Sequence, residues 1–363
     1  MQPNPQRLDP SGHLPGRDLG AVVAHLGPLW EELRGARLLI TGGTGFFGAW
    51  LLESLCRAED AFGLGLGAWV LSRDPEGYGG RMPHVAGHPA ITLIQGDVRD
   101  FELPSVPFTH VVHAATSTDA ALHADRPWEV LDTILGGTRH LLESLNPGGL
   151  RRLLMVSSGA VYGEQPSDLG GVPETHSGGP DPLEPSSAYA EGKRAAELLC
   201  AQWSRRTSVP VTYARGFAFV GPHLPLDAHF AIGNFLRDAL NGQPIVVQGD
   251  GTPMRSYLYG SDLAVWLWTI LLRGRPGAAY NVGSDEAVSI AELAREIATL
   301  AGVPVEIRGT PTPGMHPKRY VPSIDRARSE LGLEVTVPRR EAICRTLEWH
   351  RPGFAPSGWG LTP

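Results

Sequence analysis

Three residues in the middle of the chain have types and a spacing that could move a proton. Tyr189 and Lys193 are four residues apart, which places both side chains on one face of a helix, and Ser158 directly follows an apolar run. An ammonium group near a phenol favours the phenolate, so it lowers the tyrosine pKa toward neutrality. A serine hydroxyl can hold a substrate oxygen in line with that phenol. Together the three residues predict a site for general acid–base catalysis. A tyrosine and a lysine at this spacing also occur on ordinary surface helices.

A glycine-rich turn nearer the N-terminus could hold a phosphate group. Residues 41–48 read Thr-Gly-Gly-Thr-Gly-Phe-Phe-Gly and lie between a short apolar run and a helical pattern. Gly42 permits a tight turn, Gly45 lets a pyrophosphate approach the backbone, and Gly48 lets helix and strand pack closely. The helix N-terminus adds unpaired N–H groups and a partial positive charge. When a strand precedes it and a helix follows it, such a turn predicts a dinucleotide-binding site. The glycine pattern by itself also fits a tight loop that binds nothing.

The elements that must position these residues alternate between strands and helices. Expected strands cover residues 38–40, 68–71, 91–94, 110–115, 153–156, 211–214, 245–247 and 279–282. Expected helices cover residues 21–33, 49–55, 128–145, 189–205, 230–240 and 262–272. This alternation indicates an α/β fold with a Rossmann-type, doubly wound parallel sheet and a smaller, interleaved C-terminal α/β substrate lobe.

We expect four regions along the chain. They are an N-terminal extension with a helix (1–35), a dinucleotide-binding domain (36–215 and about 258–284), a substrate lobe (216–257 and 285–345) and a tail (346–363). Within the extension, residues 1–20 are polar and rich in proline. This composition predicts a leader segment that is either flexible or lies along the protein surface.

Composition excludes several classes of function. The chain has 363 residues and a net charge of −7. This composition gives no sign of the positively charged surface that binding to nucleic acid requires. No apolar run reaches the roughly 18 residues of a membrane span, and the first residues do not resemble a signal peptide, so we expect a cytoplasmic protein. We expect buried, reduced thiols at Cys56, Cys200 and Cys344. We expect no metal, because four histidines lack metal-ligand spacing: His110, His113, His123 and His229.

Taken in order, these and further motifs resemble one family, the extended short-chain dehydrogenase/reductases of the nucleotide-sugar epimerase/dehydratase group. The motifs are residues 41–48, 96–98, 113–115, 156–163 and 189–193, Arg215 with 220–222, 249–251 with Arg255 and 257–262, and 281–283. The resemblance covers about residues 36–345. It implies that Tyr189 is the general base or acid, that Lys193 binds the nicotinamide ribose and tunes Tyr189, and that Ser158 positions the sugar hydroxyl or carbonyl. It also implies a homodimer that pairs through helices 128–145 and 189–205.

The resemblance places a set of residues around the cofactor: Gly42, Thr44, Gly45, Phe46, Phe47, Gly48, Val98, Ala114, Ala115 and Lys193. Asp97 would contact the adenine edge, or else cap a turn. Ser72 stands where NAD enzymes of the family carry an aspartate, and Arg73 follows it. A guanidinium group suits a 2′-phosphate, so we favour NADP over NAD. In the alternative, Arg73 is a solvated loop residue and Asp74 binds the ribose.

The residues after Ser158 bear on the reaction. In this family, 4,6-dehydratases carry an acidic pair at this point and the related decarboxylases keep a glutamate, but this chain has Gly159 and Ala160. Neither can transfer a proton, so dehydration would need a carboxylate from elsewhere, such as Glu164 or Glu174. Reversible hydride transfer remains, and we favour a 4-epimerase over a 4-keto-sugar reductase and a dehydratase. A dinucleotide-binding regulatory protein is the alternative that is not an enzyme.

The substrate expected from the resemblance is a nucleotide-diphosphate sugar. Arg255 and Arg319 resemble the arginines that grip its diphosphate, although each could instead form a surface salt bridge. Asn234 could contact a phosphate or the base. Two departures from the family pattern, Ala218 and Ser256, weaken the transfer of substrate details.

Overall fold

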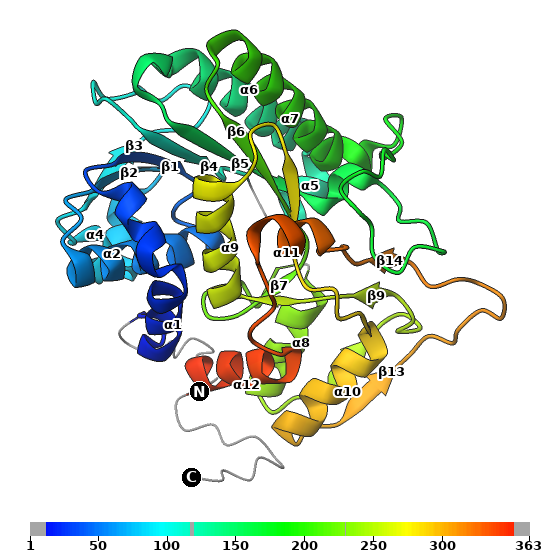
Figure 1. Cartoon of the computed structure of the whole chain (residues 1–363). Helices are drawn as coiled ribbons and strands as arrows, with labels where there is room; N and C mark the ends of the chain where they lie inside the picture. Colours follow the sequence, from blue (N-terminus) through cyan, green and yellow to red (C-terminus); the bar gives the residue numbers. More distant parts are fainter. Residues whose placement is uncertain (1–11, 117–119, 229, 352–363) are drawn as a thin grey trace.

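The computed structural model of the chain describes residues 12–116, 120–228 and 230–351 (Figure 1). Its centre is a parallel sheet of seven strands in the order β11-β6-β5-β4-β1-β2-β3. The strands are β1 (Arg37–Thr41), β2 (Gly67–Ser72), β3 (Ile91–Gln95), β4 (His110–His113), β5 (Arg152–Ser158), β6 (Val211–Gly216) and β11 (Ala279–Val282). The predicted fold class, a Rossmann-type doubly wound sheet, is confirmed.

The strand order reverses at β1, which pairs with β2 on one side and with β4 on the other. In open α/β sheets, the crevice at such a switch point, beyond the carboxyl ends of the strands, is where ligands bind. The glycine-rich turn follows β1 at this point. The fold therefore places the turn where a bound ligand is expected.

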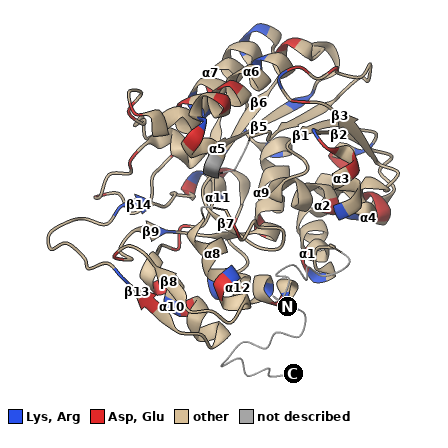
Figure 2. Cartoon of the chain, turned by 180° about the vertical axis from the view of Figure 1, so that it is seen from behind, with Lys and Arg blue, Asp and Glu red and all other residues tan. Residues whose placement is uncertain are grey.

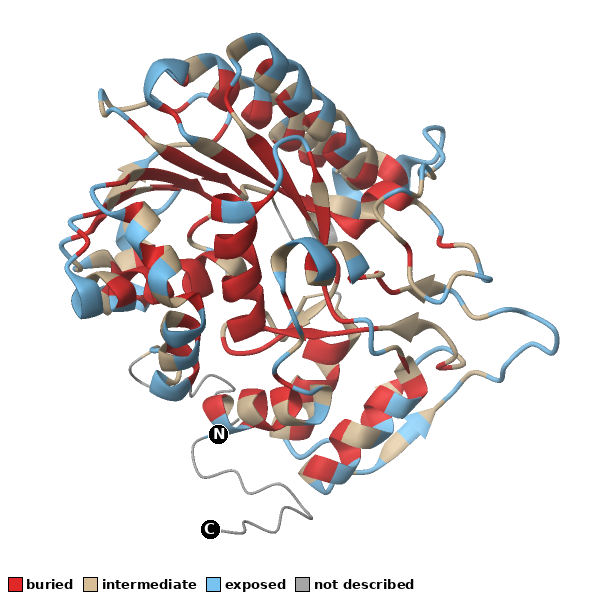
Figure 3. Ribbon diagram, in the orientation of Figure 1, coloured by how far each residue is buried: buried red, intermediate tan, exposed pale blue. Residues whose placement is uncertain are grey.

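Helices cover both faces of the sheet and make two hydrophobic cores (Figure 3). Successive residues of a strand point to opposite faces, so Leu38 and Ile40 belong to one core and Leu39 to the other. On the first face lie α1 (Gly16–Leu26), α2 (Phe46–Phe62) and α9 (Gly260–Arg273). On the second face lie α6 (Pro127–Ser144) and α7 (Ala188–Thr207), which pack against each other. Burial on both faces explains why the strands are apolar along their whole length.

A smaller group of elements lies beyond the carboxyl ends of the strands (Figure 1). Its helices are α8 (Ala231–Leu240), α10 (Ile290–Ala301), α11 (Asp325–Leu331) and α12 (Arg339–His350). Its strands are β7 (Phe219–Val220) with β10 (Leu258–Tyr259), β8 (Ile245–Val247) with β13 (Val305–Ile307), and β9 (Met254–Arg255) between β12 (Val288–Ser289) and β14 (Arg319–Tyr320). Short helices α3 (Pro75–Arg81), α4 (Pro83–Ala86) and α5 (Ala120–Asp125) complete the fold.

Two segments near the ends of the described chain are helical where the sequence predicts a leader and a tail. Helix α1 begins at Gly16, inside the expected leader, because its apolar stripe packs on α9 and its Asp18 is fully buried. The Asp18 carboxylate accepts hydrogen bonds from the Tyr259 hydroxyl at 2.6 Å and from Arg345 at 2.5 Å. Helix α12 continues to His350, past the expected start of the tail at 346, because Trp349 is buried. Residues 1–11 and 352–363 lie outside the described residues, and the division into lobes stays a prediction.

The surface and the thiols agree with the composition. Lys and Arg residues are intermixed with Asp and Glu residues over the face seen from behind (Figure 2). Cys56, Cys200 and Cys344 are buried and unpaired, as predicted. In the described part of the chain, every helix is too short or too polar to cross a membrane.

Candidate active site

Ser158 and Tyr189 meet at the carboxyl end of the sheet. Ser158 is the last residue of β5, and its hydroxyl accepts a hydrogen bond from the Ala160 amide at 3.2 Å. Tyr189 is the second residue of α7. Burial raises the pKa of Tyr189 above its ordinary value, and the hydrogen bond with Ser158 partly offsets that rise. The tyrosine is therefore a protonated phenol at neutral pH, whereas the sequence predicts a lowered pKa.

Lys193 lies one helical turn further along α7 and is almost fully buried. Its Nζ atom donates a hydrogen bond to the Val156 carbonyl at 3.0 Å and lies 5.9 Å from the centre of the Tyr189 ring. Burial lowers the pKa of Lys193 to about 8, and the Glu197 carboxylate opposes that shift. The carbonyl anchor fixes the ammonium group beneath the phenol, so the structure brings the three predicted catalytic residues together.

A second phenol, which the sequence reasoning missed, reaches the same serine. The Tyr320 hydroxyl lies 3.4 Å from Oγ of Ser158, and the same hydroxyl lies 3.4 Å from the Gly216 carbonyl oxygen. Burial raises the pKa of Tyr320, and its hydrogen bond with Ser158 opposes that shift. Ser158 thus lies between two protonated phenols. No local signal links them, because Tyr320 is 162 residues further along the chain.

The position after Ser158 has no room for a side chain. A Cβ atom on Gly159 would lie 2.7–2.9 Å from the ring of Phe217, which is closer than real Cβ contacts. Phe217 is held in place by Tyr320, whose ring centre is 4.7 Å away. An acidic residue at this position would therefore require Phe217 to move.

The two carboxylates considered as substitutes point elsewhere. Oε1 of Glu174 accepts a hydrogen bond from the Asn281 amide at 2.9 Å, and Glu164 is exposed. A third carboxylate, Glu197, accepts two hydrogen bonds from the Arg215 guanidinium at 2.7 and 2.9 Å and one from the Ser157 hydroxyl at 2.6 Å. The expected replacement of the missing acid by Glu164 or Glu174 therefore has no support in the geometry.

The glycine-rich turn has the shape of a phosphate cradle. Gly42 has a φ of +72°, and a Cβ atom there would lie 2.5 Å from the Ala114 carbonyl group; a Cβ atom on Gly48 would lie 2.0 Å from the Gly43 oxygen. Gly45 differs, because its Cβ atom would have only an ordinary contact of 3.6 Å within the protein. Gly45 is the N-cap of α2, and no side chain of the described residues caps that helix. Its first amides are therefore available to an anion, which fits a dinucleotide pyrophosphate.

Neighbouring strand ends hold the turn in position. Oγ1 of Thr41 is hydrogen-bonded to Nδ1 of His113 at 2.7 Å and accepts a bond from the Ala115 amide at 3.2 Å. Nε2 of His113 is hydrogen-bonded to Oγ1 of Thr138 on α6 at 2.9 Å, and burial lowers the pKa of His113 to about 3. The His113 imidazole is therefore neutral and links Thr41 of β1 to Thr138 of α6 through hydrogen bonds.

The remaining predicted cofactor residues border the turn. Phe47 packs on Phe219 with ring centres 4.8 Å apart, and Thr44 and Phe46 are half-buried beside it. Val98 is buried against Gly137 of α6.

At the end of β2, Ser72 is buried and accepts a hydrogen bond from the Asp74 amide at 3.2 Å. The Asp74 carboxylate caps α3 by accepting a bond from the Gly77 amide at 2.9 Å. Arg73 is exposed and makes no hydrogen bond or ion pair with any described residue. The Asp97 carboxylate is bound by Arg99, which holds the pKa of Asp97 below its usual value.

The predicted substrate residues separate into two groups. Arg255 of β9 pairs in register with Tyr320 of β14, and its guanidinium carbon lies 5.8 Å from the centre of the Tyr320 ring. Arg319 precedes Tyr320 in the strand, so it faces the other way and donates to the Gly170 carbonyl at 3.1 Å. Asn234 lies on α8 and accepts a hydrogen bond from Arg237 at 3.2 Å. The structure thus brings Arg255 near the serine and phenols, but not Arg319 or Asn234.

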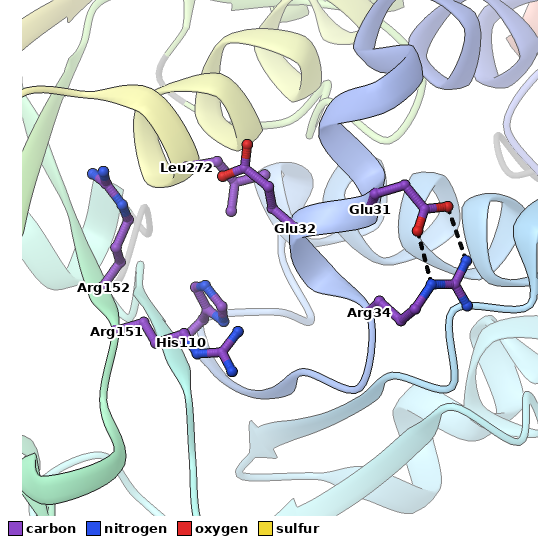
Figure 4. A pocket seen from close by; sticks show the side chains of 7 residues that line it. All are labelled: Glu31, Glu32, Arg34, His110, Arg151, Arg152 and Leu272. Carbon is purple, nitrogen blue, oxygen red and sulfur yellow. Dashed lines mark hydrogen bonds and ion pairs between the residues drawn. The ribbon is translucent and has the colours of Figure 1, made fainter.

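A separate hollow opens at the opposite edge of the sheet (Figure 4). It is lined by Glu31, Glu32, Arg34, His110, Arg151, Arg152 and Leu272. His110 is the first residue of β4 and Arg152 the first of β5, so this hollow lies at the amino ends of strands whose carboxyl ends carry the site. It takes no part in the site described above.

A phosphate cradle at the switch point, beside a serine, a tyrosine and a lysine, defines an extended short-chain dehydrogenase/reductase. Residues 38–283 match the profile of the NAD dependent epimerase/dehydratase family, and the chain belongs to that family. It is therefore an enzyme of the NAD-dependent nucleotide-sugar epimerase/dehydratase type.

Related sequences include UDP-glucuronic acid decarboxylases. UDP-glucuronic acid decarboxylase 1 of Xenopus tropicalis is 30% identical over 315 residues, which are 87% of this chain and 72% of that protein. UDP-glucuronic acid decarboxylase 5 of Arabidopsis thaliana is 30% identical over 307 residues, which are 85% of this chain and 87% of that protein.

Solved structures share the fold. DesIV, a dTDP-glucose 4,6-dehydratase of Streptomyces venezuelae with NAD bound, has a TM-score of 0.74 and 26% identity over 87% of this chain and 97% of that one. UDP-glucose 4-epimerase of Thermotoga maritima, solved with UDP-glucose, has a TM-score of 0.73 and 21% identity over 87% of this chain and 98% of that one.

Proposed function

We propose that this protein is a nucleotide-sugar 4-epimerase that works by reversible hydride transfer. One observation carries the proposal: Gly159 cannot bear a side chain while Phe217 occupies the space beside it. Without an acidic residue there, the groups gathered at Ser158 can move a hydroxyl proton, but they include no carboxylate for eliminating water.

In this mechanism the chain's own residues handle the proton and hold the sugar. Tyr189 first releases its own proton to solvent; the resulting phenolate takes the proton from the C4 hydroxyl as the carbonyl forms, and the phenol returns it when the hydroxyl forms again. Ser158 and Tyr320 hold the C4 oxygen through hydrogen bonds. The Lys193 ammonium, fixed by the Val156 carbonyl, favours the transient Tyr189 phenolate. A bound NAD(P)⁺ supplies a hydride acceptor that later gives the hydride back.

A panel of nucleotide sugars distinguishes the candidate reactions. We expect the purified enzyme with NAD(P)⁺ to give a C4 epimer of unchanged mass and no lasting rise in reduced cofactor, as followed by mass spectrometry, NMR and absorbance. Lasting consumption of NADPH by a 4-keto sugar would instead show a reductase, and loss of water would show a dehydratase. Either result would overturn the epimerase proposal.

Decarboxylation is the second candidate, because the curated relatives at 30% identity are UDP-glucuronic acid decarboxylases. Oxidation at C4 of a hexuronic acid gives a β-keto acid, whose carboxylate can leave as CO₂ without a further base. Including UDP-glucuronic acid in the panel tests this route, since the product would lose the mass of CO₂.

Tyr189→Phe tests the role of the phenol. We expect turnover to fall about 10²–10⁴-fold, the usual contribution of a positioned acid or base, while dinucleotide binding is retained. Tyr78→Phe is the control, since Tyr78 is buried at a distance from the site, in the core on the α2 side of the sheet. Full turnover by the Tyr189 variant would exclude the proposed mechanism.

We further propose that the enzyme prefers NADP. The support is the exposed Arg73, which forms no hydrogen bond or ion pair with a described residue, beside the buried Ser72, together with the use of Asp74 as a helix cap. A guanidinium bond to a 2′-phosphate is charge-assisted, so Arg73→Ala should weaken NADP binding about 10–100-fold and leave NAD binding unchanged. Calorimetric titration of both cofactors measures this, and Arg81→Ala, which removes a nearby exposed charge, is the control. Equal losses for NAD and NADP would contradict the assignment.

A further inference from the structure

A buried carboxylate far from the catalytic serine is surrounded by histidines. Glu53 lies on α2 and is 3% exposed. Oε2 of Glu53 lies 3.3 Å from Nε2 of His84, and Oε1 lies 3.7 Å from Nε2 of His223. The Leu14 amide donates to the same carboxylate at 3.0 Å. No arginine or lysine of the described chain forms an ion pair with it, so imidazole nitrogens and one amide are its polar neighbours.

A third histidine completes the cluster. The ring of His13 stacks on that of His84, with ring centres 3.6 Å apart and planes at 28°. One nitrogen of each of these rings and one oxygen of Glu53 all lie within 4.8 Å of one another.

Two of the imidazole rings around Glu53 carry buried nitrogen atoms that make no hydrogen bond within the described residues. Both ring nitrogens of His84 and Nε2 of His223 are buried and have no hydrogen-bond partner among the described residues. Buried polar atoms are rarely left unpaired, because desolvation costs free energy that only a new partner recovers. A metal ion is one such partner.

Trp349 of α12 fixes two of the histidines. Its indole N–H donates to the His13 carbonyl at 2.9 Å, and its ring centre lies 4.8 Å from that of His223. The cluster therefore joins four separate parts of the chain: the segment before α1, helix α2, helix α4 and the loop after β7.

We propose that His13, Glu53 and His84, with His223 as a fourth ligand, bind a Zn²⁺ ion that fastens the N-terminal segment to the body of the enzyme. Zinc takes imidazole nitrogen and carboxylate oxygen at 2.0–2.2 Å in a tetrahedron, which separates neighbouring ligand atoms by about 3.3 Å. The pair of His84 and Glu53 already has this spacing. Nε2 of His223 lies 3.7 Å from the other oxygen of Glu53, so the His13 and His223 rings have to move inward to complete the tetrahedron. Four protein ligands leave no open position, so the site is structural.

The expectation of no metal came from spacing along the chain. These ligands are at positions 13, 53, 84 and 223, and only the folded chain brings them together.

The test uses the full chain without an affinity tag, stripped of metal and titrated with Zn²⁺ against a coloured chelator. We expect one equivalent to bind and to raise the unfolding temperature, because an ion that binds only the folded state stabilises it. His13→Gln and His84→Gln should each weaken binding at least tenfold. His88→Gln is the matched control, since His88 faces a single exposed carboxylate, Asp60, at 3.2 Å.

Co²⁺ gives a second readout that needs no variant. In the unmodified protein it should produce the intense visible bands of a tetrahedral site, and Zn²⁺ should displace it. His13 is exposed, so its replacement leaves the fold intact and keeps the test decisive even where buried variants fail to fold. Zinc binding that is absent, or equal in the His13, His84 and His88 variants, would overturn the proposal.

Discussion

At the scale of single residues, the main finding is a serine shared by two phenols. Ser158 is hydrogen-bonded to Tyr189 and lies 3.4 Å from the Tyr320 hydroxyl. Arg255 lies over the Tyr320 ring, so this tyrosine also connects the catalytic serine with a residue expected to bind the diphosphate. We therefore expect the Tyr320 hydroxyl to orient Ser158 in addition to holding the C4 oxygen as proposed above.

The first prediction concerns Tyr320→Phe. The ring stays against Phe217, but the hydroxyl that orients Ser158 is lost, and one neutral hydrogen bond contributes about 0.5–1.5 kcal/mol. We expect kcat to fall up to about tenfold while KM for the nucleotide sugar changes little. Steady-state kinetics measures both constants, with Tyr257→Phe as a control for a buried tyrosine of the same lobe. A rise in KM at constant kcat would show that the hydroxyl only binds substrate.

At the scale of elements, the glycines of the turn between β1 and α2 have two different roles. We expect Gly42 and Gly48 to be needed for folding and Gly45 to be needed for binding. Gly42 and Gly48 have no room for a Cβ atom within the protein, whereas Gly45 does. Packing within the described chain does not require glycine at position 45, so we expect the space beside it to be used by a bound molecule.

Gly45→Ala tests that separation. The backbone angle at Gly45, φ −95°, suits alanine, so we expect an unfolding temperature close to that of the natural protein. Dinucleotide affinity should fall at least tenfold, because the new methyl group occupies the path of the pyrophosphate. Calorimetric titration and thermal unfolding give the two quantities. Gly20→Ala on α1, where no atom lies within 4 Å of the new methyl, should change neither affinity nor fold. Unchanged dinucleotide affinity in Gly45→Ala would argue against a pyrophosphate at this turn.

At the scale of the whole molecule, the outer helical layer exposes large apolar side chains. Trp128 of α6 is 77% exposed and Leu198 of α7 is 60% exposed. These helices are the ones through which the family resemblance implies a dimer, so the exposed side chains fit an interface between two copies.

We therefore expect Leu198→Glu to convert a dimer into a monomer, because a charge buried at a symmetric interface meets its own copy. Sedimentation velocity measures the change, and circular dichroism checks that the fold is kept. Leu183→Glu is the matched control, since Leu183 is 89% exposed but lies in the loop before α7. If the unmodified enzyme sediments as a monomer, the predicted dimer is wrong.

The sequence by itself determined the fold class, the glycine turn and the grouping of Ser158, Tyr189 and Lys193. These features depend on short-range physics: strand and helix periods, the geometry of a strand-to-helix turn, and two side chains one helical turn apart. It also identified Gly159 and Ala160 as residues that cannot transfer a proton, whereas only the structure shows that the ring of Phe217 fills the space beside Gly159.

Only the tertiary structure decided the contacts between distant segments. It brought Tyr320 to Ser158, turned Arg319 away from Arg255, and gathered His13, Glu53, His84 and His223 around one buried carboxylate. It also raised the pKa of Tyr189, which spacing alone had predicted to be lowered, because burial outweighs the opposing hydrogen bond with Ser158. Such contacts and burial depend on how strands and loops far apart in sequence pack, and no local pattern specifies that packing.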